Sequence, residues 1–140
     1  MKAKTFVNQI KKMDKLIENK LYEIEHWKSV AMGITSHSGG ERVQSSGSKE
    51  KMADAVGKYV DMENELNEDI DRMVFKKREV IETIEKLNYT EYDLLHKIYV
   101  QNMTFDDVSD VYGKSYSWVT TMHGRALKNL QKVLDGTWRK

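Results

Sequence analysis

Residues 103–130 read MTFDDVSDVYGKSYSWVTTMHGRALKNL, and their spacing predicts two helices joined by a tight turn. Thr104, with acidic residues two and three positions later, is a good N-cap for the first helix. Gly113 supplies the tolerance of positive φ that a tight turn needs. Because Ser115 can cap the second helix, the stretch is typical of a helix-turn-helix.

Both helices of this stretch have an apolar face. In the first helix we expect Val108, Val111 and Tyr112 to point inward. In the second, apolar residues recur at steps of three and four and predict one buried stripe. The stripe consists of Val119, Met122, Ala126, Leu127 and Leu130.

The opposite face of the second helix is polar, aromatic and cationic, as suits the phosphates and base edges of DNA. We predict that it binds DNA through Tyr116, Ser117, Trp118, Thr120, Thr121, Arg125 and Lys128. Two alternatives stay open. Tyr116 and Trp118 could instead pack against the long helices or a partner chain. Arg125 and Lys128 could simply be solvated charges.

The net charge of the 140-residue chain is only +1, but the charge is unevenly distributed. Residues 115–140 contain five cations and one acidic residue, whereas residues 90–113 contain one cation and five acidic residues. The second helix is therefore basic and the helices before it are acidic. Such a small positive surplus predicts modest, salt-sensitive affinity for DNA, which a dimer would strengthen.

The upstream residues predict two long helices. The absence of proline and a charged fraction of 32% favour an all-α fold. Apolar residues at steps of three and four predict an amphipathic helix over residues 2–32, and a glycine- and serine-rich flexible loop follows at 33–48. The apolar stripe of this helix consists of Phe6, Ile10, Met13, Ile17, Leu21, Ile24, Trp27 and Ala31. Residues 49–87 follow a near-heptad pattern. Its seam contains Met52, Val56, Tyr59, Leu66, Ile70, Met73, Val80, Ile84 and Leu87.

The second long helix needs a partner along its length, either the first helix folded back or a second copy of the chain. We expect a hairpin that also dimerises. Glu63 and Lys77 interrupt the seam and would help to set its register, unless they lie at a solvated edge. The loop is expected to be a connector, although Arg42 and residues 44–46 could bind a phosphate or a protein.

A short helix is predicted over residues 90–99, with one face that completes a small core. That face consists of Leu94, Leu95, Ile98 and Tyr99. We therefore predict an all-α chain with two domains: a helical hairpin for self-association at residues 1–88, and a three-helix helix-turn-helix domain at 89–136.

Catalytic and metal-dependent functions find little support in the sequence. The chain has no cysteine. Glu23 with His26, and Asp93 with His96, have or approach the spacing of carboxylate-bridged metal sites, but matching ligands from other helices are lacking. His37 and His123 have no apparent triad partner, and residues 38–40 lack the lysine of a phosphate loop. We expect a non-enzymatic protein without a cofactor.

Two further expectations concern the cellular compartment of the protein and the C-terminal residues of the chain. No apolar run approaches the length of a membrane span, so we expect a cytoplasmic protein. Residues 138–140 are expected to be a frayed tail.

The helix-turn-helix sequence resembles region 4 of the sigma-70 family. The residues that carry the resemblance are LLHKIY at 94–99, TFDDVSDVYGKS at 104–115, and the stretch from Val119 to Leu130. The same residues resemble the C-terminal domain of phage regulators of the ArpU and RinA type. The upstream half is similar to phage and prophage proteins of Gram-positive bacteria.

This resemblance implies a DNA-binding transcriptional regulator of phage late genes in the cytoplasm of a bacterial host, acting as a dimer or with RNA polymerase. It adds Lys114 and Ser115 to the residues predicted to contact double-stranded DNA. Lys114 departs from the family pattern, which has an apolar residue there, and could reach a phosphate. The alternative is a phage structural or small packaging-type oligomer whose helix-turn-helix mediates protein contacts.

Overall fold

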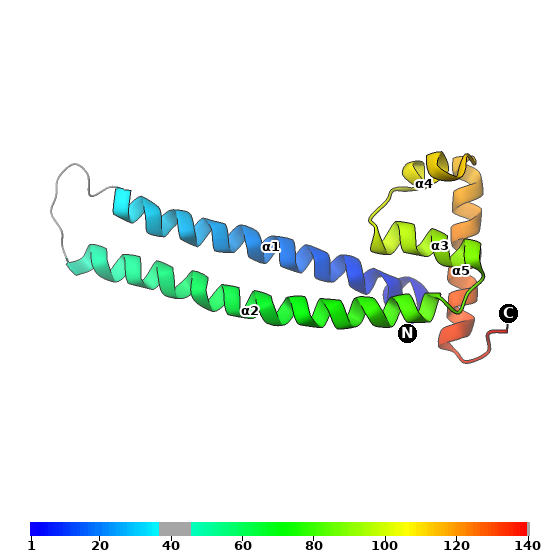
Figure 1. Cartoon of the computed structure of the whole chain (residues 1–140), viewed down its shortest axis with the longest axis horizontal. Coiled ribbons are helices and arrows are strands. Elements are labelled where there is room, and N and C mark those ends of the chain that lie inside the picture. The colour runs from blue at the N-terminus through cyan, green and yellow to red at the C-terminus, as the bar shows by residue number, and fades with distance from the viewer. Residues whose placement is uncertain (37–45, 140) are drawn as a thin grey trace. The chain divides into compact units, whose positions relative to one another are not determined.

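The computed structural model describes residues 1–36 and 46–139, and every regular element in those two ranges is a helix (Figure 1). The elements are α1 (Ala3–Ser36), α2 (Ser46–Ile84), α3 (Tyr89–Leu95), the π-helical turn η2 (His96–Val100), α4 (Phe105–Tyr112) and α5 (Tyr116–Leu134). The predicted all-α class, with a long helical hairpin followed by a helix-turn-helix, is confirmed.

The connection between α1 and α2 is shorter than the predicted loop at residues 33–48. α1 continues to Ser36 and α2 begins at Ser46, because glycine and serine weaken a helix without stopping it as proline would. The predictions about His37, residues 38–40, Arg42, Gln44 and Ser45 lie outside the described residues.

The chain divides into two compact units. Unit 1 comprises Met1–Asp14 and Met73–Lys140, and unit 2 comprises Lys15–Arg72. Each unit therefore contains part of α1 and part of α2. The boundary near residue 88 between separately folding domains stays a prediction.

Unit 2 is an antiparallel pair of helices, so the hairpin rather than a second copy provides the partner that the heptad helix needs. Lys28 pairs with Glu63 at 3.2 Å, and the Lys58 ammonium lies 5.1 Å from the centre of the Trp27 ring. Glu63 thus lies at the edge of the seam. The apolar residues buried in the described part of unit 2 are few, and two of the four are alanines: Ile24, Ala31, Ala55 and Leu66.

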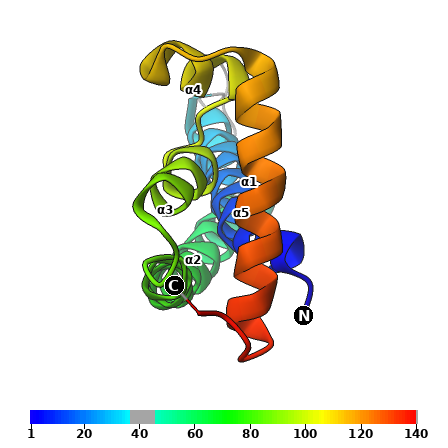
Figure 2. The ribbon, with the colours of Figure 1, turned by 90° about the vertical axis from the view of Figure 1, so that its right-hand side faces the viewer.

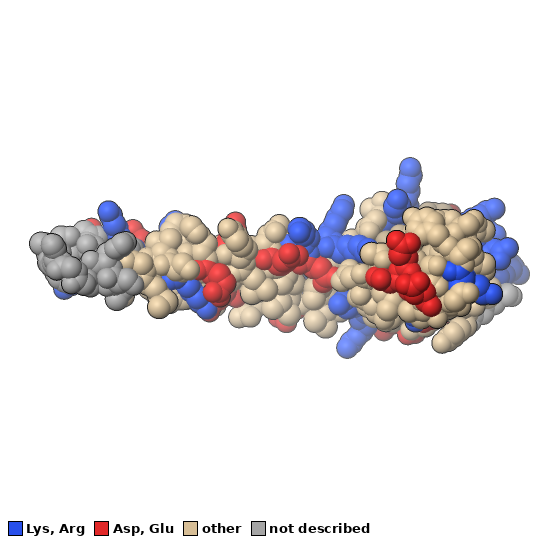
Figure 3. Space-filling model, turned by 90° about the horizontal axis from the view of Figure 1, so that it is seen from above, with Lys and Arg blue, Asp and Glu red and all other residues tan. Residues whose placement is uncertain are grey.

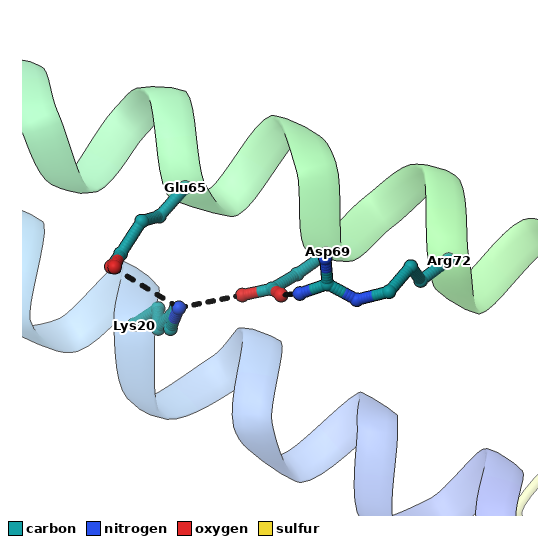
Figure 4. A network of polar contacts seen from close by, with 4 residues as sticks. All are labelled: Lys20, Glu65, Asp69 and Arg72. Atoms are coloured by element: carbon teal, nitrogen blue, oxygen red, sulfur yellow. Dashed lines mark hydrogen bonds and ion pairs between the residues drawn. The ribbon is translucent and has the colours of Figure 1, made fainter.

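A buried acidic residue lies close to the boundary of unit 2 at residue 72 (Figure 4). Asp69 is 1% exposed and pairs with Arg72, one turn along α2. The Lys20 ammonium of α1 lies 2.7 Å from Asp69 Oδ2 and 3.2 Å from Glu65 Oε2. The first contact is an ion pair without a well-directed hydrogen bond, because Oδ2 has no hydrogen-bond partner among the described residues. Lys20 therefore joins the two helices through charge.

Three residues predicted for the apolar stripes are more exposed than expected. Leu21, Met52 and Ile70 are 49%, 40% and 37% exposed. A helix that packs against a single partner covers only the centre of its stripe, so the flanks remain in contact with solvent.

Unit 1 has a larger apolar core, to which the start of α1 contributes. Phe6, Val7 and Ile10 are each at most 6% exposed and belong to the same cluster as α3, α4 and α5. Figure 2 shows the first turns of α1 beside α5, and the Ala3 N–H donates to Gln131 Oε1 at 2.8 Å. The core also contains Val80, Ile84, Leu87, Leu94, Leu95, Ile98, Tyr99, Val108, Val119, Ala126 and Leu130.

Three details of unit 1 differ from, or add to, the sequence predictions. Trp138 is not a frayed end: its indole N–H donates to the Lys86 carbonyl at 2.9 Å and its ring packs against the core. The helix predicted at 90–99 ends in a π-helical turn, with the Gln101 N–H bonded to the His96 carbonyl. In α3, Glu91 is buried and accepts hydrogen bonds from the Asn129 amide at 2.8 and 2.9 Å.

Candidate nucleic-acid interface

α4 begins with a capping box. The Thr104 hydroxyl accepts a hydrogen bond from the Asp107 N–H at 3.1 Å, and the Asp107 carboxylate accepts one from the Thr104 N–H at 3.0 Å. These bonds satisfy backbone donors that a helix start leaves free, and the negative charge suits the positive end of the helix dipole. The sequence prediction of this cap is confirmed.

The turn between α4 and α5 depends on Gly113. Its φ of 63° lies in the left-handed region, which a residue with a side chain enters at a cost. The turn is closed by two bonds between Ser109 and Lys114. The Lys114 N–H donates to the Ser109 carbonyl at 3.1 Å, and the Ser109 hydroxyl donates to the Lys114 carbonyl.

α5 starts at an N-cap, where the Ser115 hydroxyl accepts a hydrogen bond from the Trp118 N–H at 3.0 Å. Val119, Ala126 and Leu130 anchor the helix in the core, as predicted. One prediction about α4 is wrong, because Val111 is 57% exposed. A helix of eight residues buries a narrow stripe, and Val108 with the partly buried Tyr112 already fills it.

The predicted DNA-contact residues differ in exposure. Trp118 and Thr120 are half-buried. The Thr120 hydroxyl donates to the Ser117 carbonyl at 2.9 Å, so it is partly occupied within the helix. The exposed ones are Lys114, Ser115, Tyr116, Ser117, Thr121, Arg125 and Lys128.

The two aromatic residues at the start of α5 pack against α4. Trp118 makes an edge contact with Tyr112, with ring centres 5.5 Å apart, and the Lys114 ammonium lies 5.8 Å from the Trp118 ring. Tyr116 lies 5.9 Å from Phe105 but remains 54% exposed. Trp118 therefore helps to fix the angle between the helices, whereas about half of the Tyr116 surface remains in contact with solvent.

The cations of α5 remain available for a ligand. Within the described residues, neither Arg125 nor Lys128 forms an ion pair, and the closest polar contact of Arg125 is the Met122 sulfur at 4.0 Å. In Figure 3, acidic side chains gather over α4 and basic ones lie around the same end of the molecule. The surface charge is thus locally polarised, as the sequence indicated.

A polar network fixes α4 to α3. The Tyr112 hydroxyl donates to Asp93, and the Lys97 ammonium lies 3.0 Å from the same carboxylate. Burial raises the pKa of Asp93, but the bonds from Tyr112 and Lys97 outweigh it and leave the pKa below its usual value. Burial and the bond to Asp93 raise the pKa of Tyr112. Asp93, which has near-metal-site spacing with His96, therefore already binds Tyr112 and Lys97 within the fold.

His123 of α5 lies against Tyr99, with 2.7 Å between its Nε2 and the Tyr99 hydroxyl. Burial lowers the pKa of His123, and the positive charges of Lys4 and Lys11 lower it further. Burial also raises the pKa of Tyr99 to about 12. The pair is thus neutral at physiological pH and contributes to the packing of η2 against α5.

Lys2 and Lys4 at the start of the chain line a groove together with Gly124 and Lys128 of α5. The sequence places these lysines in the predicted hairpin and gives no sign that they belong to this surface. No local pattern could have revealed them, because they meet α5 only through tertiary packing.

The described residues contain no group of three or more His, Cys, Asp or Glu side chains that could hold a metal ion. In the described ranges, no helix has the length and hydropathy needed to cross a membrane. The fold and its exposed surface thus define a helix-turn-helix protein that presents a polar, cationic helix.

The chain belongs to the family described as "Protein of unknown function (DUF1492)", whose model matches residues 34–131. It is also similar to the RNA polymerase sigma factor SigO of Bacillus subtilis (strain 168), with 24% identity over 87 residues. That match covers 62% of this chain and 47% of the sigma factor, so the chain spans about half the length of this relative. No solved structure matches the chain.

Proposed function

We propose that this chain is a non-enzymatic, sequence-specific DNA-binding regulator of transcription, and that α5 enters the major groove as its recognition helix. The observation that carries the proposal is that Arg125 and Lys128, on the outer face of a helix fixed by the Gly113 turn, form no ion pair with any residue that the structure describes. Cationic and hydroxyl side chains on one helix match the donors and acceptors of phosphates and base edges. Similarity to a sigma factor supports the same class of function.

We assign different roles to the predicted contact residues. Arg125 and Thr121 are proposed to read bases, whereas Lys114 and Lys128 bind phosphates. Tyr116 and Ser117, both exposed at the start of α5, are proposed to approach the groove first. Ser115, Trp118 and Thr120 contribute chiefly by holding the helix in place, because each already has a partner within the fold.

The biological setting is part of the proposal. The resemblance to regulators of the ArpU and RinA type supports a role in phage or prophage late-gene transcription, in the cytoplasm of a bacterial host. RNA polymerase is the proposed second partner, because the relative named above is a sigma factor of that enzyme.

Self-association is proposed to supply the affinity that a single copy lacks. α2 exposes Val74 and Phe75 to 53% and 74%, and large apolar side chains on one helix favour association. The same observation favours the second candidate function, an assembly protein whose helix-turn-helix binds other proteins. The two candidates differ in whether the chain binds duplex DNA.

The test is binding to a duplex enriched from a random-sequence library by the wild-type protein, compared with a scrambled duplex. Arg125→Ala should weaken binding to the enriched duplex by about 1–3 kcal/mol and reduce discrimination between the two. Lys128→Ala should weaken binding to both and reduce the slope of log affinity against log salt by about one. The matched control is Lys86→Ala, an exposed lysine in the turn that follows α2.

Helicity measured by circular dichroism shows whether the variants fold. If folded Arg125→Ala and Lys128→Ala bind as tightly as the wild type, α5 is not the DNA-binding surface. If the wild type binds no duplex even at low salt, the DNA-binding function is wrong and the assembly function is favoured.

A further inference from the structure

The first residues of the chain and α5 border a shallow, open groove on the surface of unit 1. Lys2, Ala3 and Lys4 line one side, and Gly124, Lys128 and Gln131 line the other. All of these residues belong to unit 1. The groove therefore runs along the same helix whose exposed side chains form the predicted DNA surface.

Gln131 holds the two sides of the groove together. Its carbonyl oxygen accepts the Ala3 N–H at 2.8 Å, and its amide donates to the Met1 carbonyl at 3.2 Å. The buried Phe6 and Val7 anchor the next turn of α1 in the core. Lys2 and Lys4 are thus attached to a fixed backbone rather than to a frayed end.

The groove is positively charged and open. Lys2, Lys4 and Lys128 are all exposed, and none of them forms an ion pair within the described residues. The acidic residue in the groove is Asp135, which accepts a hydrogen bond from Gln131 at 3.2 Å. At Gly124 an added Cβ would meet nothing within 4 Å, so a ligand can approach the backbone of α5 closely there.

We propose that Lys2 and Lys4 bind phosphates of the DNA backbone beside the major groove that α5 enters. This inference rests on the proposed function and adds the start of α1 to the DNA-binding surface. A DNA phosphate backbone fits this groove, because it offers a row of negative charges to three lysine ammonium groups. These groups surround Gly124, which has no side chain to block the approach to α5. The first helix then has two tasks, to complete the core of unit 1 and to supply cations next to α5.

The test compares Lys2→Ala/Lys4→Ala with the wild type, on the enriched duplex and on the scrambled duplex. Loss of two phosphate contacts should reduce the slope of log affinity against log salt by about two and weaken binding to both duplexes about tenfold at physiological salt. Discrimination between the duplexes should not change, since phosphate contacts carry no sequence information. Lys2→Arg/Lys4→Arg, which keeps both charges, should restore the slope.

The matched control is Lys12→Ala/Lys86→Ala, which removes two exposed lysines of unit 1 that do not line the groove. It should alter the slope much less than the Lys2/Lys4 variant. An equal change in the two double variants would show a general charge effect and overturn the inference. An unchanged slope in Lys2→Ala/Lys4→Ala would also overturn it, while loss of binding in Arg125→Ala would leave the proposed function standing.

Discussion

The two units use the same two long helices in different ways. In unit 1, α1 and α2 contribute Phe6, Ile10 and Val80 to an apolar core shared with α3, α4 and α5. In unit 2 the described parts of the helices bury four apolar residues, two of which are alanines, and one acidic residue, and ion pairs such as Lys28–Glu63 join them. The difference teaches that amphipathic periodicity predicts a helix but not how much burial stabilises it. We expect unit 2 to open locally before unit 1.

The largest effect is expected from Ile10→Ala. Ile10 is fully buried in unit 1, so removing its outer methyl groups should lower the free energy of unfolding by about 2–5 kcal/mol. Urea denaturation measures this change, and hydrogen exchange should show weaker protection in α5. Leu16→Ala is the control, because Leu16 is on the same helix, belongs to unit 2 and is 42% exposed. If both variants lose equal stability, the contrast between the units is wrong.

The next largest effect concerns the buried charge of unit 2. Lys20→Met removes a partner of Asp69 and should destabilise the chain by up to about 3 kcal/mol, less than for a fully unpaired charge because Arg72 remains. Lys20→Met/Asp69→Leu should recover most of this loss, since the buried charge is gone. Thermal and urea unfolding of the wild type, the two single variants Lys20→Met and Asp69→Leu, and the double variant give the free energies of unfolding. A double variant no more stable than Lys20→Met would show that Asp69 is not the cause.

Replacing a glycine by alanine should change the free energy of unfolding in opposite directions in the two units. Gly113→Ala places a side chain at a φ of 63° and should cost about 1–2 kcal/mol, although its Cβ would meet no atom within 4 Å. Gly57→Ala lies within α2, also in open space, and should stabilise the chain by up to about 1 kcal/mol. The denaturation midpoints of both variants provide the measurement. A neutral Gly113→Ala would argue against the turn geometry.

The smallest effect is a pH dependence that should be specific to unit 1. Because burial together with Lys4 and Lys11 lowers the pKa of folded His123 below 6.5, the unfolded chain takes up this proton first. Stability should therefore be insensitive to His123 above about pH 7 and should fall as the pH drops through about 6.5 toward the folded pKa. Unfolding free energies at several pH values measure this.

Replacing His123 separates its contribution to the pH dependence of stability from that of the other titratable groups. His123→Gln should remove part of the loss of stability between about pH 7 and pH 5. His26→Gln, at an exposed position of unit 2, serves as the matched control and should follow the wild type. Identical pH profiles for His123→Gln and the wild type would mean that His123 is not the titrating group.

The sequence predicted the parts that depend on local pattern. The N-cap at Thr104, the turn at Gly113 and the buried stripe containing Val119 and Leu130 all follow from residue type and spacing, and the structure confirms them. The exposed polar face of α5 follows from the same periodicity. Its binding function stays a prediction.

The sequence could not predict contacts between distant segments. The packing of Phe6 and Ile10 into the core of unit 1 joins residues more than a hundred positions apart, and no local signal marks it. Lys2 and Lys4 were missed as groove residues for the same reason. Trp138 was misjudged because its partner, the Lys86 carbonyl, is also distant in sequence.

The most direct test of the account is to map the DNA surface on the wild-type protein. Amide chemical shifts measured by NMR during titration with the enriched duplex should change for residues 114–128 and for Lys2 and Lys4, while α2 residues of unit 2 remain unaffected. The same titration with the scrambled duplex should give smaller changes at Thr121 and Arg125. Changes confined to α2, with α5 unaffected, would contradict the account.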